Sequence, residues 1–285
     1  MILVGTATGL HRVDGGSDLG GREITALAGE WALVEGRAVW HGEIVGQVPE
    51  GNLATCLLPA GDGDALVGTD DGHLWRISAS GAELVDGFEK APGRAGWYTP
   101  WGGPAGVRSL AAGPDGTVYV NVHVGGILRS ADDGATWAPT LDQELDVHQV
   151  VAAEDGTVVA ATARGLATST DEGGTWTVAS DGLHATYARA VAVAGDTVLL
   201  TVSTGPDGRR AGVYRRALHG DGPFERALVG LPGSFPGNVD TGCLAAGPDL
   251  AVLGTFAGRV YASTDAGATW RTIAAGPPVT CVSVS

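Results

Sequence analysis

Three histidines are candidates for metal binding. His123, His148 and His184 come from neighbouring parts of the chain, and three imidazoles can bind Zn, Cu, Fe or Ni while leaving positions open for substrate. Tyr187 and Asp240 are candidates for acid-base work beside such a centre. The set predicts a metal-assisted enzyme, a hydrolase, lyase or oxidoreductase with a transition metal as cofactor. Because no short ligand spacing such as His-x-x-x-His is present, hydrogen-bonded or solvent-exposed histidines are the alternative interpretation.

Arginine and aromatic side chains predict a second function, the binding of a small anionic ligand. The guanidinium groups of Arg108 and Arg189 can each bind a carboxylate through two parallel hydrogen bonds. Concave binding sites also combine aromatic surface with a few polar groups. We therefore expect a carboxylate-bearing ligand to be held by Arg108, Arg189 and His148, with Arg94 nearby and an aromatic wall of Trp97, Tyr98 and Trp101. Alternatively, the arginines pair with acidic neighbours such as Asp240 and only stiffen the structure.

An eight-residue pattern occurs three times in the chain. The pattern is Ser-x-Asp-x-Gly-x-Thr-Trp, and its copies span residues 130–137, 169–176 and 263–270. The types of residue are those of a β-hairpin turn: the Asp carboxylate accepts bonds from turn amides, Gly takes a positive φ, and Trp packs against a strand. The repeat therefore predicts a β-rich protein built from similar hairpins.

These repeats resemble the Asp box, or BNR repeat, of sialidase-like β-propellers in the WD40-YVTN-BNR-like group. The resemblance implies that ligands bind on the face opposite the Asp-box turns. Sialidase chemistry itself needs an arginine cluster and a tyrosine nucleophile with a partner glutamate. The Arg-Ile-Pro signature of sialidases is absent, and no Glu stands beside Tyr187 or Tyr98. A sialidase-like glycoside hydrolase is therefore a further alternative, as is a protein-interaction scaffold.

The strand pattern around the repeats predicts an all-β, seven-bladed β-propeller that forms one domain over residues 1–285. Each repeat follows two apolar strands separated by a turn, and weaker copies of this unit occur elsewhere in the chain. One blade is expected to combine both termini, which would close the ring. The predicted blades are 1–21 with 279–285, about 24–50, 52–90, 106–145, 146–183, 184–232 and 236–277.

Alignment of the predicted innermost strands places polar or small residues at one equivalent position. They are expected to line the central funnel, where the ligand would bind. The aligned residues are Thr25, Thr55, Arg108, His148, Arg189, Gly242 and Thr280. The neighbouring position contains Cys56, Cys243 and Cys281, which are expected to be small packing residues between blades.

Charge and composition limit the classes of partner. The chain has 17 basic and 32 acidic residues, a formal net charge of −15, which repels phosphate backbones and anionic lipid surfaces. We therefore expect neither nucleic acid nor a membrane as partner, and a small molecule or a protein instead. The first residues lack the pattern of a signal peptide and no apolar run is long enough to cross a bilayer, so a cytoplasmic location is expected. Three cysteines do not suggest a disulfide framework.

Overall fold

The computed structural model describes residues 1–61 and 63–285, and their strands form seven four-stranded antiparallel sheets. The protein is thus an all-β, seven-bladed β-propeller, as the sequence predicts. The chain divides into two compact units. Unit 1 comprises Met1–Glu30, Ala161–Leu166 and Val178–Ser285, and unit 2 comprises Trp31–Ala160 and Ala167–Thr177. No helix of the described chain is long and apolar enough to span a membrane.

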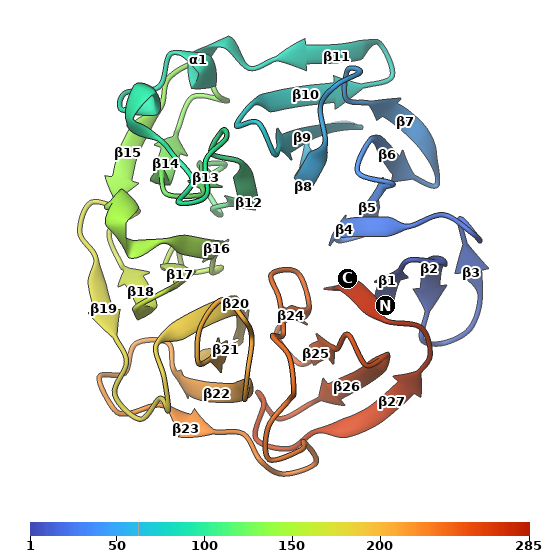
Figure 1. The fold of residues 1–285 in the computed structure, drawn as a ribbon, viewed down its shortest axis with the longest axis vertical. Coiled ribbons are helices and arrows are strands. Elements are labelled where there is room, and N and C mark those ends of the chain that lie inside the picture. The colour runs from blue at the N-terminus through green and yellow to red at the C-terminus, as the bar shows by residue number, and fades with distance from the viewer. Residues whose placement is uncertain (62) are drawn as a thin grey trace. The chain divides into compact units, whose positions relative to one another are not determined.

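The first blade is built from both ends of the chain, as predicted. Strand β1 lies between β28 and β2 (Figure 1), and its register pairs Val4 with Val282. The terminal residues continue the pairing, because the Ser285 amide donates to the Met1 carbonyl at 3.0 Å. The strands of this blade are β28 (Val279–Val284), β1 (Ile2–Thr6), β2 (Gly9–Arg12) and β3 (Ser17–Asp18).

The other six blades follow one another along the sequence, each with four consecutive strands. The next two contain β4 (Ile24–Ala28), β5 (Trp31–Val34), β6 (Ala38–His41) and β7 (Glu43–Gln47), then β8 (Ala54–Ala60), β9 (Asp64–Thr69), β10 (Leu74–Ser78) and β11 (Gly81–Leu84). The following two contain β12 (Val107–Ala112), β13 (Val118–Val122), β14 (Gly126–Ser130) and β15 (Ala138–Leu141), then β16 (Val147–Ala152), β17 (Val158–Thr162), β18 (Gly165–Ser169) and β19 (Thr177–Ala179). The last two contain β20 (Tyr187–Ala194), β21 (Thr197–Ser203), β22 (Gly212–Ala217) and β23 (Glu225–Arg226), then β24 (Leu244–Ala246), β25 (Ala251–Gly254), β26 (Arg259–Ser263) and β27 (Arg271–Ala275). Helix α1 (Asp86–Glu89) and two 3₁₀ turns, Arg94–Gly96 and Gln143–Leu145, interrupt the β structure.

The three repeated turns have the same hydrogen bonds in each copy. In the first, the Asp132 carboxylate accepts from the Thr136 amide at 2.8 Å and from the Thr136 hydroxyl at 2.6 Å, and the Ser130 hydroxyl donates to the same carboxylate at 2.9 Å. The Gly134 residue has a φ of +87°, and its carbonyl accepts from the Trp137 indole at 3.0 Å. Equivalent bonds centre on Asp171 and Asp265. The predicted hairpin-turn chemistry is confirmed.

Apolar residues of the inner and middle strands form the cores of the two units. In unit 2, the Phe88 ring of α1 is fully buried and packs edge-on against Trp137, with 5.3 Å between ring centroids. In unit 1, Leu199 and Trp270 belong to one buried cluster. The cysteines Cys56, Cys243 and Cys281 are buried and free, in agreement with the packing role expected from the sequence.

A bulge interrupts the pairing of several innermost strands at the aligned polar position. In β12 the partners step from Val107 to Ser109, so Arg108 is the extra residue, and Arg189 is the extra residue of β20 in the same way. Thr55 and Thr280 occupy the corresponding bulges of β8 and β28. Because a bulge changes the direction of a side chain in the strand, it presents these residues differently from their neighbours.

Candidate functional site

A group of predicted functional side chains in unit 2 surrounds Asp146. Its Oδ1 atom lies 3.3 Å from His123 Nε2 and 3.8 Å from Arg108 Nη1, and its Oδ2 atom lies 3.4 Å from His148 Nε2. The two histidines are almost completely buried, whereas the side chains of Arg108 and Asp146 are 25% and 30% exposed. With Trp101, described below, these residues form what we term the Asp146 site.

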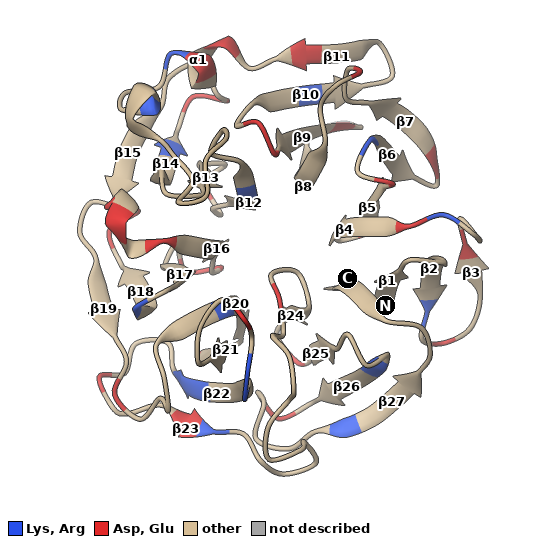
Figure 2. Cartoon of the chain, viewed as in Figure 1, with Lys and Arg blue, Asp and Glu red and all other residues tan. Residues whose placement is uncertain are grey.

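Three strands and one unusual backbone conformation build this site. Arg108 stands on the bulge of β12, His123 follows β13, and His148 is the second residue of β16. Asp146 ends the 3₁₀ turn Gln143–Leu145 with a φ of +46°. Asp is one of the few residues that adopt this left-handed conformation readily. Figure 2 shows the basic segment of β12 and the acidic segment that leads into β16.

The surroundings of Asp146 favour its ionised form. Burial acts to raise the pKa of the carboxyl, but the contacts with His123 and His148 and the positive charge of Arg108 together outweigh it and hold the pKa well below its usual range. The site therefore contains a persistent negative charge that is shared by one guanidinium and two imidazoles. Sequence reasoning missed Asp146, although its position immediately before the strand that carries His148 was visible in the sequence.

The three residues of the predicted aromatic wall, Trp97, Tyr98 and Trp101, lie in different surroundings. Trp101 is 73% exposed and its ring lies over His123, with 4.8 Å between ring centroids. Tyr98 is also exposed. Trp97 is half-buried and packs against Phe88 at a centroid distance of 5.4 Å. Of the three predicted aromatic residues, Trp101 is therefore the one that brings a ring to the Asp146 site, tilted by 37° to the His123 ring.

Arg94 belongs to a separate ion-pair network of unit 2. Its Nη2 atom donates to Glu89 at 2.8 Å, and its guanidinium carbon lies 5.0 Å from the centre of the Trp97 ring. His73 joins this network through a 2.9 Å contact with Glu89. A shallow groove of about 740 Å³ lies alongside, lined by Glu89, Lys90, Ala91, Gly93, Arg94, Ala95, Gly96 and Gln143.

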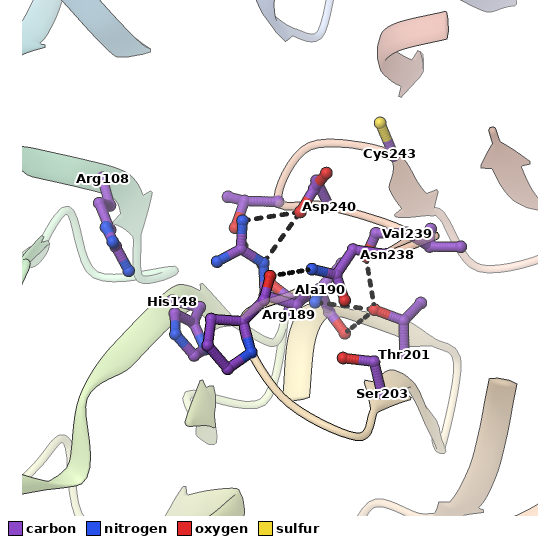
Figure 3. A network of polar contacts seen from close by, with 12 residues as sticks. Arg108, His148, Arg189, Ala190, Thr201, Ser203, Asn238, Val239, Asp240 and Cys243 are labelled. Atoms are coloured by element: carbon purple, nitrogen blue, oxygen red, sulfur yellow. Dashed lines mark hydrogen bonds and ion pairs between the residues drawn. The ribbon is translucent and has the colours of Figure 1, made fainter. Parts of the chain in front are cut away.

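In unit 1, Arg189 pairs tightly with Asp240. Its Nε and Nη2 atoms donate to Asp240 Oδ1 at 2.9 and 2.7 Å (Figure 3). The Tyr187 ring centre lies 6.0 Å from the Arg189 guanidinium carbon. This arrangement is the pairing with an acidic neighbour that the sequence offered as an alternative to ligand binding.

The third predicted histidine has a different partner. His184, in unit 1, has its Nδ1 atom 2.7 Å from the Tyr214 hydroxyl, and burial lowers its pKa. In residues 1–61 and 63–285, no group of three or more His, Cys, Asp or Glu side chains is arranged to hold a metal ion. The metal site of His123, His148 and His184 therefore has no support in the described structure and stays a prediction.

Comparisons with known proteins identify relatives of the fold. The family described as the DUF6242 beta propeller domain matches residues 100–192. A search of curated proteins found no match. Solved structures with a similar fold include the WD40 repeats of RRP9, with a TM-score of 0.67, 15% identity, and coverage of 100% of this chain and 89% of that one. An ancestral GH74 enzyme gives a TM-score of 0.65 at 14% identity and covers 95% of this chain, which spans only 40% of that enzyme.

A third similar structure is YCF48 bound to D1 peptide. Its TM-score is 0.55 at 14% identity, with coverage of 96% of this chain and 83% of that one. These neighbours include an enzyme, a repeat protein and a peptide-bound protein. At such low identity the likeness supports the propeller fold and leaves the function to be argued from the site.

Proposed function

We propose that this protein is an Asp-box (BNR) propeller that binds a small carboxylate-bearing ligand at the Asp146 site. The observation that carries the proposal is the combination of Arg108, whose Nη1 atom lies 3.8 Å from Asp146, with the exposed ring of Trp101 over His123. The identical hydrogen bonds of the three repeated turns support the Asp-box assignment.

Arg108 is better suited than Arg189 to receive an anionic ligand. The Arg189 guanidinium makes two short hydrogen bonds to Asp240, and a ligand would have to displace that carboxylate. The 3.8 Å separation of Arg108 Nη1 from Asp146 exceeds hydrogen-bond length. The Arg108–Asp146 pair is therefore looser than the Arg189–Asp240 pair, and a ligand carboxylate at Arg108 would compete with a more distant aspartate.

Trp101 gives the proposed ligand a second point of contact. An indole ring that is 73% exposed presents a large apolar face to solvent. Its other contact, with His123, holds the ring close to the charged group. A carboxylate attached to an aromatic or sugar ring fits this pair of features, because the ring would stack on Trp101 while the charge meets Arg108.

The test is a binding screen with matched charged and uncharged probes. Benzoate, phenylacetate and glucuronate would be compared with benzyl alcohol and glucose by ligand-observed NMR. Arg108→Gln is expected to weaken binding of the carboxylate probes about tenfold or more, because a charge-assisted bond is lost. Trp101→Ala is expected to weaken binding about two- to tenfold through lost ring contact. The proposal fails if no carboxylate binds, or if Arg108→Gln binds each probe as tightly as the unaltered protein.

Arg129→Gln is the matched control for the arginine variant. Arg129 lies on β14 and pairs with Glu172 of the second repeated turn, so it makes a comparable ion pair outside the Asp146 site. This substitution is expected to leave binding of the carboxylate probes unchanged. Equal loss of binding in both variants would show a general effect of removing positive charge and would contradict a specific role for Arg108.

The metal-assisted enzyme is tested on the same protein. His123 and His148 both contact Asp146, but among the residues that the structure describes no group of three or more His, Cys, Asp or Glu side chains is arranged to hold a metal ion. We therefore expect no transition metal to bind at these residues. Elemental analysis of untagged protein, before and after incubation with zinc, checks this expectation, and stoichiometric zinc that is lost in His148→Gln would favour the enzyme hypothesis.

A further inference from the structure

A small pocket in unit 1 has a lining that differs from that of the Asp146 site. Its volume is about 230 Å³, and it is lined by Asn238, Val239, Asp240, Cys243, Gly254, Phe256, Val279 and Thr280. Figure 3 shows the segment that carries Asn238, Val239 and Asp240, with Cys243 further along the same connection. The pocket is small for an organic ligand, since typical ligand pockets are about 300–1,000 Å³, so it would hold only a short molecule.

The polar groups of this pocket are predominantly hydrogen-bond acceptors. Asp240 uses one carboxylate oxygen, Oδ1, for both bonds from Arg189, and its side chain is 52% exposed, which leaves Oδ2 for another donor. The Thr280 hydroxyl donates its hydrogen to the Ile24 carbonyl at 2.5 Å, so its oxygen can accept from the Cys281 thiol, 3.7 Å away, and from an incoming donor.

Asn238 supplies an acceptor that lacks a partner in the described structure. Its amide nitrogen donates to the Pro206 carbonyl at 3.2 Å, which fixes the orientation of the side chain (Figure 3). The amide oxygen Oδ1 is buried and accepts no hydrogen bond from the residues that the structure describes. A buried acceptor without a donor is unfavourable, and because this oxygen has almost no exposed surface its missing partner is an internal water and not a ligand in the pocket.

An exposed aromatic ring stands at the same pocket. Phe256 is 80% exposed. It lies in a tight turn in which the Thr255 hydroxyl donates to the Arg259 carbonyl at 3.1 Å and the Gly258 amide donates to the Thr255 carbonyl at 2.9 Å. The turn therefore holds an aromatic face in solvent at a pocket that Asp240 also lines, and both groups attract a cation.

The segment that carries the acceptors is held in place by buried hydrogen bonds. The Thr201 hydroxyl donates to the Val239 carbonyl and accepts from the Ala190 amide, each at 2.9 Å. The Cys243 amide donates to the Asp240 carbonyl at 2.9 Å. These bonds position Asp240 before any ligand arrives, which lowers the entropic cost of binding.

We propose that this pocket binds a primary alkylammonium ion, such as the end of a small amine. The N–H donors of an ammonium group match Asp240 Oδ2 and the Thr280 hydroxyl oxygen, and the alkyl part would contact Phe256 and the apolar walls. Arg189 reduces the negative charge of Asp240, but the net charge of −15 concentrates cations near the protein as a whole. The inference does not depend on ligand binding at the Asp146 site.

Four probes of related size separate the contributions of charge and hydrogen bonding. Butylammonium is expected to bind at least about tenfold more tightly than 1-butanol, which lacks the charge, and its binding should weaken as sodium chloride is added. Tetramethylammonium has the charge but no N–H donor and should bind more weakly than butylammonium. Butyrate, the anion of similar length, should not bind in this pocket. Chemical shifts of backbone amides during titration would report both affinity and location.

Two variants and two controls complete the experiment. Asp240→Asn is expected to weaken butylammonium binding about tenfold or more, and Phe256→Ala about two- to fivefold. Asp249→Asn and Leu228→Ala remove an exposed carboxylate and an exposed apolar side chain outside the pocket and should have no effect. Because Phe256 is so exposed, its replacement should leave folding intact even if Asp240→Asn is destabilised. The proposal is overturned if butylammonium and 1-butanol bind equally, if tetramethylammonium binds as tightly as butylammonium, or if Phe256→Ala and Asp240→Asn both bind as the unaltered protein does.

Discussion

Replacing Thr201 with valine tests the role of buried hydrogen bonds in shaping the inner strands of unit 1. The side chain is almost completely buried, and its hydroxyl joins the Ala190 amide to the Val239 carbonyl. Ala190 directly follows Arg189, the extra residue of the β20 bulge. The hydroxyl therefore supplies a partner for an amide at the point where the ladder is interrupted.

The magnitude follows from the two backbone groups that lose their partner. A buried donor or acceptor left unsatisfied costs about 1–3 kcal/mol, and valine fills nearly the same space as threonine. Thr201→Val is therefore expected to lower the free energy of unfolding by about 2–6 kcal/mol. Urea denaturation followed by tryptophan fluorescence and by circular dichroism would measure this change, provided that both signals give the same transition at an unchanged m value.

Two further substitutions show whether the hydroxyl is responsible. Thr201→Ser keeps the hydroxyl and should recover at least half of the lost stability. Thr204→Val removes a hydroxyl that donates to the Arg209 carbonyl at an exposed position, and it should change stability by less than about 0.5 kcal/mol. If Thr201→Val is as stable as the unaltered protein, the argument that this hydroxyl satisfies two buried groups is refuted.

Two predictions concern the repeated turns and the cysteines. Hydrogen bonds from the hydroxyl and amide of Thr269, and then the bond from Ser263, lower the pKa of Asp265 from 3.8 to about 2. A carboxyl whose pKa is lowered by folding stabilises the folded state at any pH above its pKa in the unfolded chain, and this stabilisation is lost as the pH falls to its pKa in the folded protein. Asp265→Asn should therefore lower Tm at pH 7, and the difference in Tm should narrow as the pH falls from about 4 to about 2. An equal difference in Tm at pH 7 and pH 2 would contradict this assignment. Burial raises the pKa of Cys56 and of Cys281 to about 12, so the folded protein should not react with a thiol reagent at pH 8, whereas the unfolded protein should expose three reactive thiols. Rapid labelling of the folded protein would show that these thiols are accessible.

Local sequence patterns were sufficient to predict the hairpin turns and the number of blades. Each repeated turn is specified within eight residues, because the Asp, Gly and Trp that it requires are close together in the sequence, as residues 130–137 illustrate. The pairing of Arg189 with Asp240 was also recognised as an alternative, since opposite charges were expected at the same end of neighbouring inner strands. These predictions depend on the fixed spacing of the strands more than on details of packing.

The features that sequence reasoning missed depend on backbone conformation and on packing between distant segments. Asp146 reaches its histidine partners from a left-handed conformation that no motif in the sequence marks. Trp97 looks like its neighbours Tyr98 and Trp101, but it packs against Phe88, whose burial depends on the short helix α1. The binding pocket proposed at Asp240 was also missed, because its lining comes from segments that are distant in the sequence.

Two arginines stand on equivalent bulges of inner strands but have different surroundings. Arg108 and Arg189 each meet an aspartate from the segment that leads into the next blade, Asp146 before β16 and Asp240 before β24. Asp240 lies 2.7 Å from its arginine, whereas Asp146 lies 3.8 Å from Arg108 and is also contacted by two histidines. The same arrangement of arginine and aspartate thus gives a close ion pair, Arg189–Asp240, in unit 1. In unit 2 it gives a longer Arg108–Asp146 contact in which the carboxylate is shared with two histidines. The histidines draw the Asp146 carboxylate toward themselves. The affinity of Arg108 for an anionic ligand should therefore depend on His123 and His148. Replacing both histidines with glutamine should tighten the Arg108–Asp146 pair and weaken ligand binding at Arg108.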